Sequence, residues 1–230
     1  MKKKYLKNAG IVLVVLILIC AGGFFVYVSN YYHALDYEVA NVNVTEENNY
    51  TIYGNSDSET GFIFYPGGKV EAAAYEPILS ELAEKGICSV LAEMPYNLAV
   101  FDSDAAVNIM NDLPKVKNWY IGGHSLGGAM AASFAAEHQE DFKGVVLLAA
   151  YPTDKLEIPV LSIYGSEDEV LNKEKYKDSI GLAENLTEIV IDGANHAQFG
   201  HYGEQSGDGQ AKISKEDQWN ETAEQIEEFI

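Results

Sequence analysis

Short runs of apolar residues recur along the last three quarters of the chain and alternate with stretches of helical spacing. The runs lie at residues 62–65, 87–92, 119–121, 145–149, 160–164 and 188–191. A short continuous apolar run of this kind is typical of a strand that is buried on both faces. Between the runs, apolar side chains recur every three or four positions, as at Ile78, Leu79 and Leu82, which predicts amphipathic helices. Strands that alternate with helices predict an α/β fold, with a mostly parallel central sheet and helices on both faces.

Two connections refine this architecture. Residues 39–52 alternate between apolar and polar positions, with Val42, Val44, Tyr50 and Ile52 on the apolar side, which predicts an antiparallel hairpin at a sheet edge. Only residues 150–159 separate the strands at 145–149 and 160–164. A lid domain does not fit into so short a connection, so we expect an open site.

The N-terminus carries a different pattern, a run of 20 uncharged residues from Ala9 to Val28 that follows four lysines. As a helix, such a run spans roughly 30 Å, the thickness of the hydrocarbon layer of a membrane. Because lysines favour the cytoplasmic side, we expect a basic tail at residues 1–8, a transmembrane anchor at 9–28, a connector at 29–48 and an extracytoplasmic catalytic domain at 49–230. The alternative is a signal peptide with its apolar core at 11–21, whose cleavage would release a secreted protein.

Composition and charge exclude one class of partner. The chain has 230 residues, 47% of them hydrophobic, and a formal net charge of −20, which suits one soluble domain with a sizeable core. Beyond the N-terminal lysines, 11 of the 15 basic residues face 35 carboxylates, a balance of −24. Such a surface repels nucleic acid, so we expect no nucleic-acid partner.

The most informative motif is GGHSLGG at residues 122–128, which places Ser125 between Gly123 and Gly127 at the spacing G-x-S-x-G. A serine on a tight strand-to-helix turn leaves no room for side chains two residues before or after it. An apolar strand precedes the motif and a stretch of helix formers follows it. The pattern therefore predicts that Ser125 is a nucleophile.

A serine nucleophile needs a histidine base and a carboxylate that orients the histidine. After an elbow serine, the acid and then the histidine are expected in loops that follow late strands. Asp168 in YGSEDEV and His196 in DGANHAQFG occupy such places. Glu167 and Glu169 are alternatives for the acid, and His201 is the alternative for the base. His124 precedes the serine, where the turn directs the side chain away, so we expect a structural role for it.

The motifs FYPGGKV, GGHSLGG, YGSEDEV and NHAQFG, in this order, resemble those of α/β-hydrolases. The resemblance covers about residues 61–229 and is closest to the small lid-less group that includes dienelactone hydrolases and membrane-anchored bacterial hydrolases. It implies an α/β-hydrolase fold, with Ser125 as nucleophile, Asp168 as acid and His196 as base.

An oxyanion hole is expected from two backbone N–H groups, one after the nucleophile and one in the loop that follows the first parallel strand. Leu126 supplies the first. Aligning PGG with the family's His-Gly-x loop makes Gly68 the expected second donor, with Lys69 as the alternative and Pro66 in place of the usual histidine. The candidate pocket walls are aromatic side chains near strand ends, at Tyr96, Phe101, Tyr151, Phe199 and Tyr202.

The motifs together predict a serine hydrolase that cleaves a carboxylic ester, or a related lactone or other acyl bond, through an acyl-enzyme. The same triad fits an acyltransferase, and the fold alone also fits a non-catalytic binding module on the membrane. The sequence has no spacing typical of a metal site, since His196, His201 and the neighbouring aspartates lie in one loop. It also has no motif typical of a phosphate-binding loop. We therefore expect no metal and no cofactor.

Overall fold

The computed structural model of this chain describes residues 2–39 and 41–230, with side chains from residue 13 onward. Met1 of the expected basic tail and Ala40 of the expected connector lie outside the described residues. Contacts divide the chain into two compact units, residues 1–31 and residues 32–230. Most of the segment that the sequence assigns to a connector thus belongs to the second unit.

Helix α1 (Lys2–Ser29) makes up almost all of the first unit and contains the uncharged run at 9–28. Among residues 2–39 and 41–230, no helix combines the length and the apolar character that crossing a membrane requires. The membrane anchor stays a prediction from the sequence.

The second unit is built on an eight-stranded sheet in the order β1-β2-β4-β3-β5-β6-β7-β8. Its strands are β1 (Val44–Glu46), β2 (Tyr50–Tyr53), β3 (Thr60–Tyr65), β4 (Cys88–Ala92), β5 (Asn118–His124), β6 (Phe142–Leu148), β7 (Leu156–Gly165) and β8 (Ala183–Ile191). Strands β3 to β8 run parallel, while β1 pairs antiparallel with β2 and β2 with β4. The mostly parallel sheet and the antiparallel edge hairpin expected from the sequence are confirmed.

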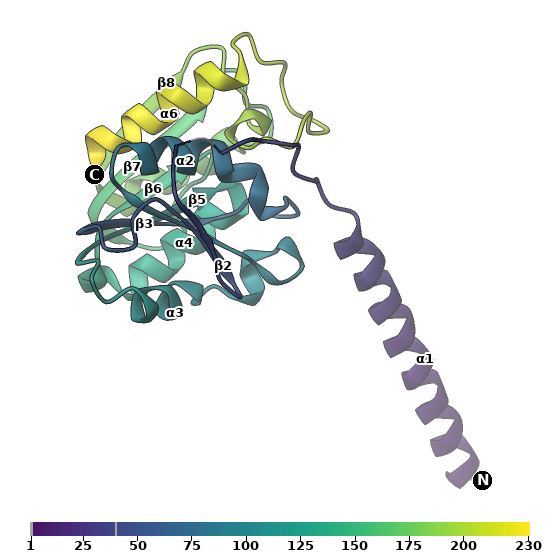
Figure 1. Ribbon diagram of the computed structural model, residues 1–230. Coiled ribbons are helices and arrows are strands. Elements are labelled where there is room, and N and C mark those ends of the chain that lie inside the picture. The colour runs from purple at the N-terminus through teal and green to yellow at the C-terminus, as the bar shows by residue number, and fades with distance from the viewer. Residues whose placement is uncertain (1, 40) are drawn as a thin grey trace. The chain divides into compact units, whose positions relative to one another are not determined.

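Helices cover both faces of this sheet, as the alternation of strands and helices predicts (Figure 1). The longer ones are α2 (Glu76–Glu84), α3 (Ala105–Asp112), α4 (Ser125–Glu137), α5 (Lys173–Ser179) and α6 (Lys215–Phe229). Short 3-10 turns lie at η1 (Ala72–Tyr75), η2 (Pro95–Asn97), η3 (Ala99–Phe101), η4 (Gln139–Asp141), η5 (Ile180–Leu182) and η6 (Ala197–Phe199).

Two hydrophobic clusters, one on each face, form the core. In β3, Ile63 and Tyr65 join the cluster that contains buried residues of α3 and α4, whereas Phe62 and Phe64 join the one that contains buried residues of α2 and α6. Successive strand residues point to opposite faces, so an apolar run in a strand fills both clusters at once.

The strands β7 and β8 begin earlier than the apolar runs indicate. Strand β7 starts at Leu156 and passes through Pro159, where the pairing with β8 shifts register. Proline has no N–H for the ladder, so a strand can contain it only at a bulge or an edge. Strand β8 starts at Ala183 and is an edge strand with mostly exposed side chains, so its polar first half lacks the apolar signal of a buried strand.

The connection from β6 to β7 comprises residues 149–155. No helix lies in this described stretch, which agrees with the expectation that no lid domain is inserted there.

Candidate active site

Ser125 stands on the turn from β5 to α4, with a left-handed backbone at φ 52°. A non-glycine residue adopts this conformation rarely and at a cost in free energy. The two flanking glycines are required by space, because a Cβ on Gly123 would lie 2.4 Å from the carbonyl oxygen of Tyr65 and one on Gly127 would lie 2.1 Å from that of Pro66. The sharp strand-to-helix turn predicted from G-x-S-x-G is present.

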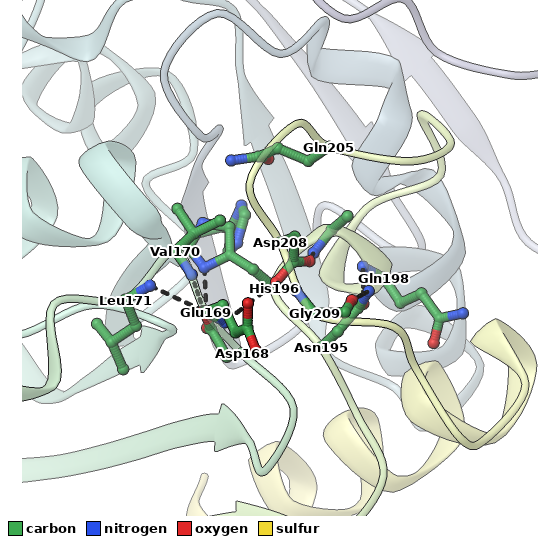
Figure 2. A network of polar contacts seen from close by, with 12 residues as sticks. Asp168, Glu169, Val170, Leu171, Asn195, His196, Gln198, Gln205, Asp208 and Gly209 are labelled. Carbon is green, nitrogen blue, oxygen red and sulfur yellow. Dashed lines mark hydrogen bonds and ion pairs between the residues drawn. The ribbon is translucent and has the colours of Figure 1, made fainter.

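His196 and Asp168 form a buried pair, with Nδ1 of the histidine 2.9 Å from Oδ2 of the aspartate (Figure 2). The other carboxylate oxygen, Oδ1, accepts hydrogen bonds from the backbone N–H groups of Val170 at 2.9 Å and Leu171 at 2.8 Å. These two bonds orient the carboxylate toward the ring. Because Nδ1 donates to Asp168, the neutral ring leaves Nε2 unprotonated and able to accept a proton.

The alternatives for the acid and the base point elsewhere. Glu167 pairs with Lys212 at 2.8 Å, and Glu169 is exposed. His201 lies 3.3 Å from the backbone oxygen of Asp36 through Nε2 and 3.3 Å from Nζ of Lys215 through Nδ1. Neither glutamate is therefore the carboxylate that contacts His196.

Ser125, Leu126 and His196 line one pocket of about 210 Å³. Its remaining lining residues are mostly small or aliphatic, at Ala129, Ala149, Ala150, Tyr151, Val170, Leu171 and Asn172. Of the five aromatic residues expected to form pocket walls, only Tyr151 is among them. A larger cavity of about 570 Å³ is lined by residues of the segment 195–211 together with Leu35 and Lys215, and neither Ser125 nor His196 contributes to it.

The loop after β3 brings Gly68 against the residue that follows the serine. A Cβ on Gly68 would lie 2.8 Å from Cδ2 of Leu126. The backbone N–H of Lys69 donates to the carbonyl oxygen of Asn97 at 2.7 Å, and that of Gly67 donates to Oη of Tyr75 at 3.0 Å. Within the described part of the chain, no group accepts a hydrogen bond from the N–H of Gly68. Of the two candidate donors, Gly68 is thus the one whose N–H is available.

The loop that carries His196 is held by polar contacts that the sequence did not predict (Figure 2). Asn195 exchanges two hydrogen bonds with the buried side chain of Gln218 on α6, its N–H donating to Oε1 at 3.2 Å and its carbonyl accepting from Nε2 at 2.9 Å. Asp208 accepts from the N–H of Ala197 at 2.8 Å. A signal for Gln218 did exist, since it is a polar residue beside Trp219 on the apolar face of α6.

Among the described residues, no group of three or more His, Cys, Asp or Glu side chains is placed to hold a metal ion. The chemistry that the site can carry with its own groups is proton transfer at Nε2 of His196, nucleophilic attack by Ser125 and hydrogen bonding to an anionic oxygen.

The fold is shared with esterases and other hydrolases of known structure. Est1E from Butyrivibrio proteoclasticus, solved with ferulic acid bound, is 16% identical and covers 85% of this chain and 98% of its own, with a TM-score of 0.61. A predicted CIB-like hydrolase from Thermoplasma acidophilum is 14% identical, covers 82% of this chain and 100% of its own, and has a TM-score of 0.58. A bacterial membrane phospholipase A is 13% identical, covers 100% and 98%, and has a TM-score of 0.59. Similarity at these identities shows the fold alone.

No curated protein matches this sequence. The model of the alpha/beta hydrolase family matches residues 61–220, which is more than half of the chain and includes all but the first residue of β3, the serine turn and the loop of His196. This chain therefore belongs to the alpha/beta hydrolase family.

Proposed function

We propose that this protein is a serine hydrolase that cleaves a carboxylic ester through an acyl-enzyme, within the small lid-less group of its family. Oγ of Ser125 attacks the carbonyl carbon while Nε2 of His196 takes the hydroxyl proton. The N–H groups of Leu126 and Gly68 stabilise the resulting oxyanion. The intermediate collapses, the C–O bond to the alcohol breaks, and His196 gives the proton to the departing alcohol. Water then adds to the acyl-enzyme with His196 as base, and the acid is released.

One observation carries this proposal: Ser125 and His196 line the same pocket, and His196 is bound to a buried carboxylate. A serine in a strained turn, a histidine with Nε2 left unprotonated and an orienting aspartate are the three parts that a serine nucleophile requires. Pure binding would need none of them.

The pocket supports a small acyl or alcohol group as the part of the substrate that it encloses. Its volume of about 210 Å³ is below the range of about 300–1,000 Å³ typical of pockets for drug-sized ligands. The fold similarity to Est1E with its bound ferulic acid is compatible with a carboxylic ester. We propose a short ester as the first substrate to test, with lactones as the next.

The test is hydrolysis of p-nitrophenyl acetate and butyrate, together with labelling by a fluorophosphonate probe. We expect labelled, active wild type and no labelling or turnover for Ser125→Ala. The control is Ser133→Ala, which changes a serine of the same helix outside the pocket and should leave both readouts intact. Equal labelling of the wild type and of Ser125→Ala would overturn the assignment of the nucleophile.

The same assay separates the other chemistries. Adding methanol or glycerol to the reaction and measuring the new ester would reveal acyl transfer, since the acyl-enzyme then reacts with alcohol in place of water. Binding of p-nitrophenyl butyrate without turnover, unchanged in His196→Ala, would favour a binding module and contradict the proposed enzyme.

We also propose that residues 9–28 anchor the protein in the cell membrane, with the hydrolase unit outside the cytoplasm. The support is the 20-residue uncharged run and the lysines at positions 2, 3, 4 and 7. In cell fractionation, the full chain should sediment with membranes, and a variant that begins at Tyr32 should not. A mature form whose N-terminus starts after Ala21 or Gly23 would instead show a cleaved signal peptide.

A further inference from the structure

Behind the serine turn lies a pair of buried polar side chains, Tyr75 and His124, that the reaction as proposed does not use. Tyr75 ends η1, and His124 is the last residue of β5, directly before Ser125. Both are almost fully buried, with exposed fractions of 0% and 1%. Oη of Tyr75 lies 2.8 Å from Nδ1 of His124. Burying polar groups costs free energy unless they are hydrogen-bonded, and this hydrogen bond offsets part of that cost.

The pair contacts the glycine loop after β3. Oη of Tyr75 also accepts the backbone N–H of Gly67 at 3.0 Å, so the hydroxyl bonds to both Gly67 and His124. A Cβ on Gly67 would lie 2.6 Å from this oxygen and 2.8 Å from Nδ1 of His124. Gly67 is thus pressed against both members of the pair, and it directly precedes Gly68, the candidate oxyanion donor.

His124 also contacts the base. The ring centroid of His124 lies 4.4 Å from that of His196, at an interplanar angle of 51°. One buried imidazole therefore adjoins the loop that holds the oxyanion donor on one side and the proton acceptor on the other.

The direction of the hydrogen bonds follows from counting donors. The oxygen of Tyr75 already accepts from Gly67, and its own proton needs an acceptor in a buried place, which Nδ1 of a neutral imidazole supplies. Tyr75 then donates to His124, whose ring proton lies on Nε2, a buried atom that has no hydrogen-bond partner among the described residues. The reverse direction would leave both the proton of Tyr75 and Nε2 without a partner, so it costs more. Burial raises the pKa of Tyr75, so its hydroxyl stays protonated. Burial, and then the charge of His196, hold the pKa of His124 well below its usual value of 6.5, so its ring stays neutral.

We infer that Tyr75 and His124 are positioning residues, which fix the N–H of Gly68 for the oxyanion through Gly67 and pack the ring of His196 in place. The inference rests on the proposed function, because it assigns the pair a role in the same acyl transfer. A neutral His124 adds no positive charge next to the imidazolium that His196 becomes when it takes the serine proton.

The test compares two Tyr→Phe changes that remove the same kinds of hydrogen bond. Tyr75→Phe removes the acceptor of the Gly67 N–H and the donor to His124. Tyr65→Phe is the matched control, because Oη of this buried tyrosine accepts from the N–H of Ala106 at 2.9 Å and donates to the carbonyl of Ser103 at 3.0 Å, next to α3. We expect kcat for p-nitrophenyl butyrate to fall about 10- to 100-fold in Tyr75→Phe, with KM within a factor of about two, because a misplaced donor affects the transition state. Tyr65→Phe should keep kcat.

The partner is tested by a double-mutant cycle. His124→Phe keeps an aromatic ring and removes the hydrogen-bond acceptor. The variant Tyr75→Phe/His124→Phe should be no slower than the slower single variant, because both changes break the same hydrogen bond between residues 75 and 124. His124→Asn retains an acceptor near the position of Nδ1 and should recover part of kcat. Multiplicative losses in the double variant, or equal kcat for Tyr75→Phe and Tyr65→Phe, would overturn the inference.

Amide hydrogen exchange of residues 67–71 gives a readout that does not depend on turnover. Exchange of this loop should be faster in Tyr75→Phe than in Tyr65→Phe and the wild type. A wild type without Ser125-dependent turnover would refute the proposed function, while unchanged exchange in Tyr75→Phe would refute the role of the pair in holding the loop.

Discussion

At the scale of single residues, Asp168 assigns its two oxygens to different tasks. Oδ1 is fixed by two backbone N–H groups of its own loop, which leaves Oδ2 for Nδ1 of His196. The sequence predicted both partners because each follows a strand end, where parallel sheets gather their functional residues. It did not predict Asn195, Gln218 or Tyr75 as parts of the site, because their partners are distant in the chain and their residue types occur equally in ordinary cores and loops.

Asp168→Asn should lower kcat for p-nitrophenyl butyrate by a factor on the order of 10⁴. The asparagine amide can donate to Nδ1, which would place the ring proton on Nε2 and remove the base. The control is Asp178→Asn on the exposed side of α5, which should keep the wild-type kcat. A loss of less than tenfold would contradict the orienting role of Asp168.

Gly67→Ala should destabilise the fold, because the added methyl group would meet Oη of Tyr75 and Nδ1 of His124, both buried. Overpacking of this kind costs about 1–3 kcal/mol in the free energy of unfolding. Gly181→Ala is the control, since nothing lies within 4 Å of its Cβ position. Urea unfolding measures the stability of both variants. Equal midpoints would show that the loop of Gly67 can shift to accommodate the added methyl group.

At the scale of elements, apolar periodicity located the buried strands and missed the polar first half of β8. The first half of β8 and the short helix α5 have mostly exposed side chains, so hydrophobic pattern carries little information about them. Helix α6 carries both sequence signals of a helix, apolar spacing and an N-terminal cap. Its apolar residues repeat at helical spacing, and the Oγ of Ser214 accepts the N–H of Asp217 at 3.1 Å as an N-terminal cap.

Helix α6 also supports the base through Gln218. Gln218→Ala would leave the N–H and C=O of Asn195 without their buried partners, at about 1–3 kcal/mol for each unsatisfied group. We expect a lower unfolding midpoint and a lower kcat, because Asn195 directly precedes His196. Glu221→Ala on the exposed side of the same helix is the control and should change neither. Unchanged kcat in Gln218→Ala would show that the loop is held by its other contacts.

At the scale of the whole molecule, acid should destabilise the fold through His124. Its pKa is lowered in the folded state by burial and by His196, while the unfolded chain has the usual value of 6.5. Below about pH 6.5 the unfolded state therefore binds a proton that the folded state does not bind. The free energy of unfolding then decreases as the pH is lowered, by at most about 1.4 kcal/mol per pH unit for one proton. In His124→Asn, the slope of stability against pH from 6.5 to 5 should be smaller than in the wild type. An identical slope would show that His124 does not contribute.

The hydrolase unit begins before its sheet. The N–H of Tyr32 donates to the carbonyl of Lys69 at 2.8 Å, and the N–H of Glu71 donates back to Tyr32 at 2.9 Å. A variant that starts at Tyr32 should match the full chain in kcat, and one that starts at Val44 should unfold at a lower temperature and lose activity. Calorimetry and turnover assays on the two truncated variants test this expectation. Equal unfolding temperatures and equal kcat for the two would show that the segment 32–43 is dispensable.

This attachment has a mechanical meaning. The first contacts that the chain makes after residue 31 are with the loop of Lys69, and soon afterwards the N–H of Leu35 donates to the carbonyl of His201 at 2.8 Å. Tension applied to the chain N-terminal of Tyr32 would therefore act first on the hydrogen bonds to the loop of Lys69 and to His201, and only afterwards on a strand. In single-molecule pulling from the N-terminus, the first rupture should release residues 32–43 and leave the sheet intact, so catalysis would fail under force before the fold does.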